Sequence, residues 1–130
     1  MNPTFKALLA LCLCVFVGCG KKPLDPIVEK AIRKELKKPT GELTKTDLEK
    51  VKTLYLDGNQ LTEVPKRLEE LTQLTKLDLV DNQLTSAKGL EKLTKLTRLF
   101  LQDNPDLTKA QIDGLKKALP KCYIGSNPTK

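Results

Sequence analysis

From residue 51 onwards, apolar residues recur in one fixed arrangement. In residues 51–61, 74–84 and 96–107 the first, fourth and sixth positions are apolar and the ninth is asparagine. These asparagines are 23 and then 22 residues apart, and the third copy carries one inserted residue before its last leucine. Residues 119–127 look like a truncated fourth copy, with Cys122 at a leucine position. Such a repeat indicates stacked units, because one unit cannot bury its own leucines.

Each copy contains a short stretch in which apolar and polar residues alternate. In the first copy, Leu54 and Leu56 alternate with Thr53, Tyr55 and Asp57. Successive side chains of a strand point to opposite faces of a sheet. We therefore expect short strands whose leucines point into the core and whose polar residues face solvent.

An asparagine follows each expected strand, where the chain turns. A buried amide can donate to and accept from backbone groups that such a turn leaves unpaired. We assign a structural hydrogen-bonding ladder to four side chains: Asn59, Asn82, Asn104 and Asn127.

Segments before and after the repeats show helical spacing. Val28, Ile32 and Leu36 share one face, which predicts an amphipathic helix that ends before Pro39. The same spacing over residues 108–119 predicts another amphipathic helix, within the last part of the repeat region.

The starts of two helices can also be predicted. Thr46 and Glu49 match a capping box, which predicts a short helical turn beginning at Thr46. Thr108 is the expected N-cap of the helix near the C-terminus, and Gly114 lowers the helix propensity inside it.

The pattern L-x-x-L-x-L-x-x-N-x-L, at 22 to 23 residues, resembles the leucine-rich repeat, and its spacing is similar to that of bacterial internalins. The resemblance implies an α/β fold: a short leucine-rich-repeat solenoid with a parallel β-sheet on the concave face and helical caps at both ends. Residues 27–50 would form the N-terminal cap. Residues 51–127 would hold three full repeats and one truncated repeat, with a helix at about 108–119, and residues 128–130 would form a tail.

The N-terminus has the pattern of an export signal. Residues 7–17 form an uninterrupted apolar run, too short to span a bilayer but of the length found in secretory signals. The residues that end in Gly18 and Cys19 resemble the lipobox of bacterial lipoproteins. This resemblance implies a signal peptide at 1–18, lipidation of Cys19, a linker at 19–26 and a membrane-anchored lipoprotein of the bacterial cell envelope. The alternative is an ordinary signal peptide cut near Gly18, with Cys19 incidental.

The composition favours a binding scaffold over an enzyme. Leucine fills 25 of 130 positions and aromatic residues make up 4%. Histidine is absent, which removes the commonest general base and metal ligand.

After removal of the signal and lipidation of Cys19, only Cys122 remains, and we interpret it as a small buried apolar residue. Asp57, Asp78 and Asp103 match no phosphate-loop, calcium or zinc motif. We expect no catalytic residue, metal, cofactor or small-molecule substrate.

The net charge of +7 comes from the parts that flank the repeats. Residues 20–50 carry +3, residues 51–107 carry −1 and residues 108–130 carry +4, and Lys6 supplies the rest. A near-neutral repeat region in an exported chain argues against nucleic acid as a partner. The basic flanks leave open a weak attraction to anionic lipid.

The expected binding surface is the solvent-facing side of the strands. Aromatic residues and arginine, which dominate binding hot spots, occur there. The positions are Thr53, Tyr55, Asp57, Lys76, Asp78, Val80, Arg98, Phe100, Gln102 and Tyr123.

Three of these residues, Tyr55, Phe100 and Tyr123, are the only aromatics outside the signal segment, and we expect them to occupy one repeat position. The pattern predicts an unidentified protein or peptide partner, in addition to the membrane. The alternative is a passive surface lipoprotein whose basic flanks engage anionic lipid or wall polymers, since exposed strands favour aromatic residues in any case.

Overall fold

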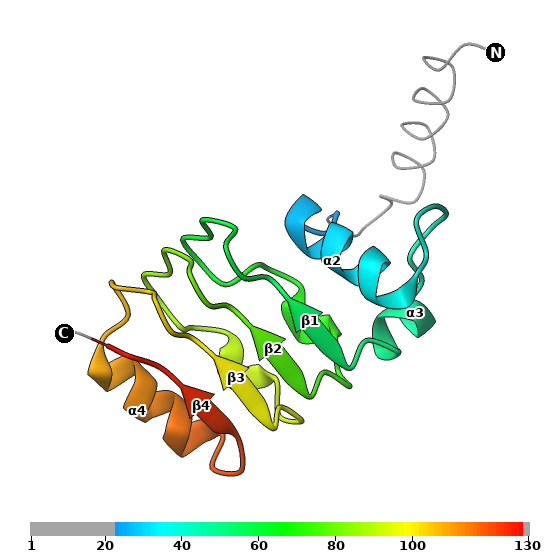
Figure 1. Cartoon of the computed structure of the whole chain (residues 1–130). Helices are drawn as coiled ribbons and strands as arrows, with labels where there is room; N and C mark the ends of the chain where they lie inside the picture. The colour runs from blue at the N-terminus through cyan, green and yellow to red at the C-terminus, as the bar shows by residue number, and fades with distance from the viewer. Residues whose placement is uncertain (1–22, 129–130) are drawn as a thin grey trace.

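The computed structural model describes residues 23–128, so the signal segment and Cys19 lie outside the described residues. Within these residues, two α-helices precede the sheet and one α-helix lies beside its last strand (Figure 1). The elements in chain order are α2 (Pro26–Leu36), α3 (Lys45–Glu49), β1 (Thr53–Tyr55), the 3-10 helix η1 (Leu68–Glu70), β2 (Lys76–Asp78), the 3-10 helix η2 (Leu90–Lys92), β3 (Arg98–Phe100), α4 (Lys109–Ala118) and β4 (Tyr123–Gly125).

The strands form one parallel sheet in the order β1-β2-β3-β4. Each coil of the chain returns through a 3-10 turn or a helix and adds the next strand beside the last (Figure 1). The pairing continues past the strand ends, where the backbone N–H of Leu56 donates to the carbonyl of Asp78 over 2.8 Å and that of Leu79 to the carbonyl of Phe100 over 2.9 Å. The predicted α/β solenoid, with a parallel sheet and helices at both ends, is confirmed.

The core consists mainly of leucine. The inward residues of the first three strands and the leucines of η1 and η2 are almost completely buried. Burial of one leucine stabilises the fold by about 1.5–3 kcal/mol relative to an exposed position. The inward strand residues, at most 1% exposed, are Leu54, Leu56, Leu77, Leu79, Leu99 and Leu101.

Helix α2 covers the first coil. Its N-cap is Asp25, whose carboxylate accepts from the backbone N–H of Ile27 over 2.8 Å. Val28 and Ile32 are fully buried, and the helix packs against β1. The helix ends at Leu36 because Lys37 takes a left-handed conformation, two residues before Pro39. The N-terminal cap thus closes the apolar end of the leucine core.

The predicted start of α3 is wrong by two residues. The N-cap is Thr44, not Thr46: the Thr44 hydroxyl accepts from the backbone N–H of Asp47 over 3.2 Å, and the Asp47 carboxylate accepts from that of Thr44 over 2.9 Å. Lys38, which follows α2, donates to the same carboxylate over 2.7 Å. This ion pair joins the segment after α2 to α3 and favours the capping box that begins at Thr44. No local sequence pattern predicts the contact.

Helix α4 takes the place that 3-10 turns occupy in the preceding coils, and it packs against η2. Thr108 is its N-cap and forms a capping box with Gln111. Ile112 and Leu115 are buried and extend the core past the last full repeat, while Gly114 is exposed.

The predicted alignment of the fourth repeat is wrong by two residues. Ile124, not Cys122, pairs with Leu99, the first inward leucine of β3. Leu119 precedes Ile124 by five residues, whereas Leu96 precedes Leu99 by three, because a turn at 120–121 follows α4. Cys122 consequently lies before the strand, half-buried at the edge of the core.

Candidate functional site

The solvent-facing side chains of the sheet form a surface that we call the open face. The strand register arranges them in two rows that run across the strands. The first row is Thr53, Lys76, Arg98 and Tyr123, and the second row is Tyr55, Asp78, Phe100 and the backbone position of Gly125, which is buried and has no side chain. The residues that continue each strand outward, Asp57, Val80 and Gln102, lie beyond the second row.

Aromatic rings and one ammonium group are in contact across the open face. The Lys76 Nζ lies 5.1 Å from the centre of the Tyr55 ring and 5.8 Å from that of Phe100, and it donates to the Tyr55 hydroxyl over 3.3 Å. The rings of Phe100 and Tyr123 are 6.0 Å apart at an angle of 58°. These four side chains, which we call the aromatic–lysine cluster, join all four strands.

The expectation that the three aromatic residues share one repeat position is wrong. Tyr55 and Phe100 lie in the second row, but Tyr123 pairs with Arg98 in the first row. Tyr123 lies in the first row because the fourth strand is aligned two residues later than the repeat pattern predicts. Tyr123 still reaches Phe100 diagonally, and with Tyr55 it is one of the two large apolar side chains that are exposed in residues 23–128, at 61% and 51%.

Charge changes sign along the strands of the open face. Lys76 and Arg98 are neighbours in the first row, whereas Asp78 lies in the second and Asp57 beyond it. The Asp78 carboxylate accepts from the backbone N–H of Val80 over 3.0 Å, so it is turned toward the end of the strand. The open face is thus basic where the strands begin and acidic where they end.

Sequence reasoning did not find Gly125 as a residue of the open face. A Cβ atom there would lie 2.6 Å from Nε2 of Gln102, so a larger residue at position 125 would require this amide to move. The Oε1 atom of Gln102 is buried and has no hydrogen-bond partner in residues 23–128. The contact depends on the shifted register of β4, which the repeat pattern does not reveal.

Asn82 and Asn104 link neighbouring coils and are both 3% exposed. The Oδ1 of Asn82 accepts from the backbone N–H groups of Asn59 and Leu61 over 3.1 and 3.0 Å. Its Nδ2 donates to the carbonyl of Leu56, in the previous coil, over 3.0 Å. Asn104 repeats the arrangement one coil later, accepting from Leu84 and donating to the carbonyl of Leu79.

The other two asparagines do not extend this ladder. Asn59 belongs to the first coil, and its Nδ2 donates to the carbonyl of Asp57, two residues earlier. Asn127 is exposed because the shifted register moves it out of the asparagine position. Its Oδ1 accepts from the backbone N–H of Asp103 over 2.7 Å, and its Nδ2 donates to the carboxylate of the same residue over 3.1 Å. The ladder prediction is therefore corrected for Asn59, whereas Asn127 still links to the preceding coil through Asp103, at the surface and not in the core.

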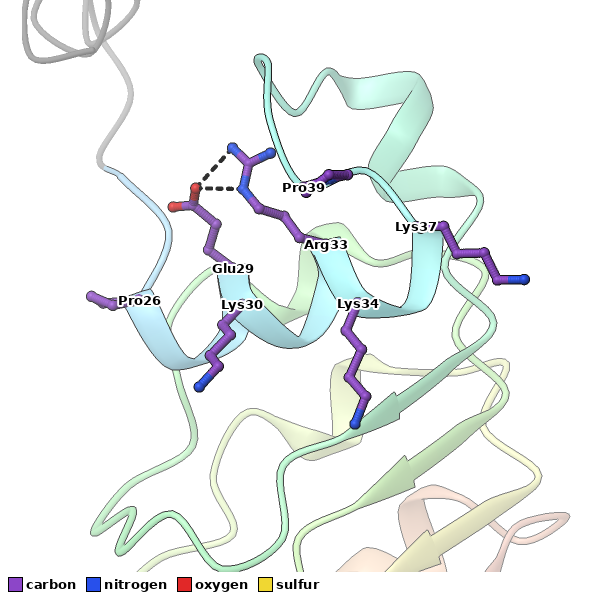
Figure 2. A pocket seen from close by; sticks show the side chains of 7 residues that line it. All are labelled: Pro26, Glu29, Lys30, Arg33, Lys34, Lys37 and Pro39. Atoms are coloured by element: carbon purple, nitrogen blue, oxygen red, sulfur yellow. Dashed lines mark hydrogen bonds and ion pairs between the residues drawn. The ribbon is translucent and has the colours of Figure 1, made fainter. Parts of the chain in front are cut away.

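The outer side of α2 forms a second candidate surface, an open depression of about 760 Å³. In Figure 2, Glu29 and Arg33 form an ion pair, at 2.9 Å, and Lys30 and Lys34 point away from it. Lys30, Lys34 and Lys37 are exposed and form no ion pair with any residue of 23–128. The depression is lined by Pro26, Glu29, Lys30, Arg33, Lys34, Lys37 and Pro39.

Other candidate chemistry is sparse within residues 23–128. Burial raises the pKa of the Cys122 thiol, which favours the protonated, unreactive form. No three His, Cys, Asp or Glu side chains of these residues lie close enough together to hold a metal ion. Among the helices of the same residues, none is long and apolar enough to cross a membrane.

Comparison with protein families agrees with the geometry. Residues 72–117 match the family model described as leucine-rich repeats in two copies. The chain has a leucine-rich-repeat fold. Comparison with the curated proteins gave no match.

Solved bacterial structures share this fold. An internalin (inlF) from Listeria monocytogenes superposes with a TM-score of 0.64 at 25% identity, over 82% of this chain and 32% of that one. Internalin C2 of the same species gives the same TM-score, identity and coverage of this chain, and 57% of its own length. A leucine-rich-repeat protein from Leptospira interrogans is 36% identical over 63% of this chain and 21% of its own, with a TM-score of 0.53. The chain spans less than two thirds of each protein.

Proposed function

We propose that the chain is a membrane-anchored leucine-rich-repeat module that binds a protein or peptide at the bacterial cell envelope through its open face. The observation that carries this proposal is the aromatic–lysine cluster. It gathers every aromatic residue of the described chain on one side of the sheet, where two tyrosines are more than half exposed. Side chains that already contact one another, as Phe100 contacts Tyr123 and Lys76 contacts Tyr55, lose less conformational freedom on binding, which favours affinity.

Substitution of two rings tests the binding role. Tyr55→Ala combined with Phe100→Ala removes both rings that flank Lys76, and it leaves the buried leucines unchanged. We expect the variant to fold but to lose capture of a crosslinked partner from intact envelopes. The matched control is Lys92→Ala with Lys116→Ala, two exposed lysines away from the sheet. Capture that is unchanged in the ring variant, with the fold intact, contradicts a binding role for the open face.

The proposed anchor is Cys19. Its thiol would carry the diacylglyceryl group through a thioether, and two or more acyl chains hold a protein stably on a membrane. We expect palmitate labelling of the full chain and its loss in Cys19→Ala. Cys122→Ala is the matched control, because Cys122 is the cysteine that remains within the described domain. Labelling that survives Cys19→Ala overturns the anchor.

The second candidate function is a passive surface lipoprotein that contacts anionic lipid or wall polymers. The exposed face of α2 favours it, because Lys30, Lys34 and Lys37 follow one another at helical spacing and form no ion pair within residues 23–128 (Figure 2). Each lysine near an anionic membrane contributes about 1 kcal/mol. If capture from envelopes survives loss of the rings but fails in Lys30→Gln/Lys34→Gln/Lys37→Gln and at high salt, this second function replaces the first.

A further inference from the structure

Two cations in the first row of the open face have no anionic partner within the described residues. Lys76 and Arg98 are direct neighbours on adjacent strands. None of the ion pairs within residues 23–128 includes either side chain. Like charges that face each other across strands are destabilising, so this pair costs stability in the free protein. An anionic group placed over the first row would relieve that repulsion.

The ammonium of Lys76 is already held in position. Contacts with the rings of Tyr55 and Phe100 and the hydrogen bond to the Tyr55 hydroxyl restrict where its Nζ can lie. Such restraint lowers the entropy lost when a ligand binds. Arg98 is exposed beside it, and its planar guanidinium can bind a carboxylate through two parallel hydrogen bonds. The two side chains together place two hydrogen-bond-donating cations side by side on the open face.

The acidic end of the open face limits where an acidic ligand can lie. Asp78 and Asp57 occupy the ends of β2 and β1, so carboxylates are repelled from the second row and beyond. The acidic groups of a ligand are therefore favoured near Arg98 and the Lys76 ammonium, away from the carboxyl ends of the strands. Three strand spacings of about 4.8 Å span roughly 14 Å, the length of four or five extended residues.

The area of the open face fits a segment better than a second copy of the chain. Four strands of three residues span roughly 14 Å by 10 Å, the size of a short peptide, whereas a stable dimer buries roughly 800 Å² of accessible surface on each partner and needs a broader face. An extended peptide can fill such a surface completely.

We infer that the open face binds an acidic peptide segment whose carboxylates pair with Lys76 and Arg98 while its apolar groups contact Tyr55, Phe100 and Tyr123. This inference rests on the proposed binding function and names the chemistry of the partner. The acidic residues lie over the first row and the apolar residues pack on the aromatic rings. Affinity is accordingly salt-dependent, because part of it comes from exposed charges.

A random dodecapeptide library, displayed on phage and selected on the purified full-length chain, tests this chemistry. We expect enrichment of Asp and Glu beside apolar residues. A peptide selected in this way should bind Lys76→Gln/Arg98→Gln about tenfold more weakly or worse, since each lost charged hydrogen bond is worth on the order of a factor of ten. The charge-reversed variant Lys76→Glu/Arg98→Glu should instead select basic peptides. Lys92→Glu/Lys116→Glu, with the same change in net charge elsewhere, should select the same peptides as the unaltered protein.

The outcomes separate the inference from the proposed function. Neutral apolar peptides that lose binding in Tyr55→Ala/Phe100→Ala, but not in Lys76→Gln/Arg98→Gln, leave the binding module in place and overturn the acidic ligand. Selection of no peptide by a folded protein counts against both. Melting temperatures of all variants show whether a loss of binding reflects a loss of fold.

Discussion

The asparagines show at the scale of single residues how the coils are held in register. Asn82 combines two roles that no apolar side chain can perform: its carbonyl accepts from two backbone N–H groups and its amide donates to carbonyls of two coils. Because Asn82 and Asn104 are buried, those backbone groups have no access to water when the side chain is absent. The ladder therefore stabilises the stack and does not form part of the open face.

Asn82→Leu tests this role. The substitution leaves buried backbone donors and acceptors unpaired, so we expect the free energy of unfolding to fall by about 1–3 kcal/mol. Urea denaturation measures the change. Asn59→Leu is the matched control, since the Asn59 amide bonds only the nearby carbonyl of Asp57 and should change stability by less than about 0.5 kcal/mol. Equal effects at both positions contradict the ladder.

At the scale of elements, the predictable features are those that local patterns determine. The leucine spacing predicted the strands and their inward faces, and the amphipathic spacing predicted α2 and α4. The predicted start of α3 is wrong because two capping-box patterns overlap, one beginning at Thr44 and one at Thr46. The contact between Lys38 and Asp47 favours Thr44. Such a tertiary contact is not visible in a local pattern.

The fourth repeat was misaligned for a related reason. A repeat pattern assumes that each coil uses the same number of residues between strands, but α4 and the following turn lengthen the last connection. Ile124 and Cys122 are both compatible with an inward position by residue type. The strand register decides between them, and it also determines that Tyr123 lies beside Arg98 and Gly125 beside Phe100. The face of the sheet was thus predictable, while the order of side chains at its last strand was not.

The cap of α3 has a predicted pH dependence. The hydrogen bond from the Lys38 ammonium and that from the Thr44 backbone lower the pKa of Asp47 to about 2. The unfolded carboxyl titrates near roughly 3.9, so its stabilising effect is complete above that pH and is lost as the pH falls toward 2. We expect the stability difference between the unaltered protein and Asp47→Asn to shrink over this range in urea denaturation.

Lys38→Gln is the control for the origin of this effect. Removal of the ammonium should raise the pKa of Asp47 toward its ordinary value. The folded and unfolded pKa values then lie closer together, so the stability contributed by the ionised Asp47 changes over a narrower pH range. A stability difference between the unaltered protein and Asp47→Asn that stays constant between pH 5 and pH 2 contradicts the role of the ionised cap.

At the scale of the whole molecule, the core and the proposed binding surface lie on different faces of the same coil. Leucines fill the interior. Helices α2 and α3 cover one end of the stack of coils, and α4 lies at the other end (Figure 1). The side chains of the aromatic–lysine cluster are not needed for this closure, so the open face can change without loss of the core. Within residues 23–128 the sheet has four strands, a width that suits the short segment proposed as its ligand.

Photo-crosslinking in intact envelopes tests the central claim, that the open face is the binding site, most directly. A photoreactive residue at position 53 would lie in the first row beside Lys76, and one at position 92 would lie in η2, outside the sheet. We predict a discrete crosslinked product from position 53 that is absent from position 92 and is lost with Tyr55→Ala/Phe100→Ala. Equal crosslinking from both positions, or a product that persists without the two rings, would contradict the account.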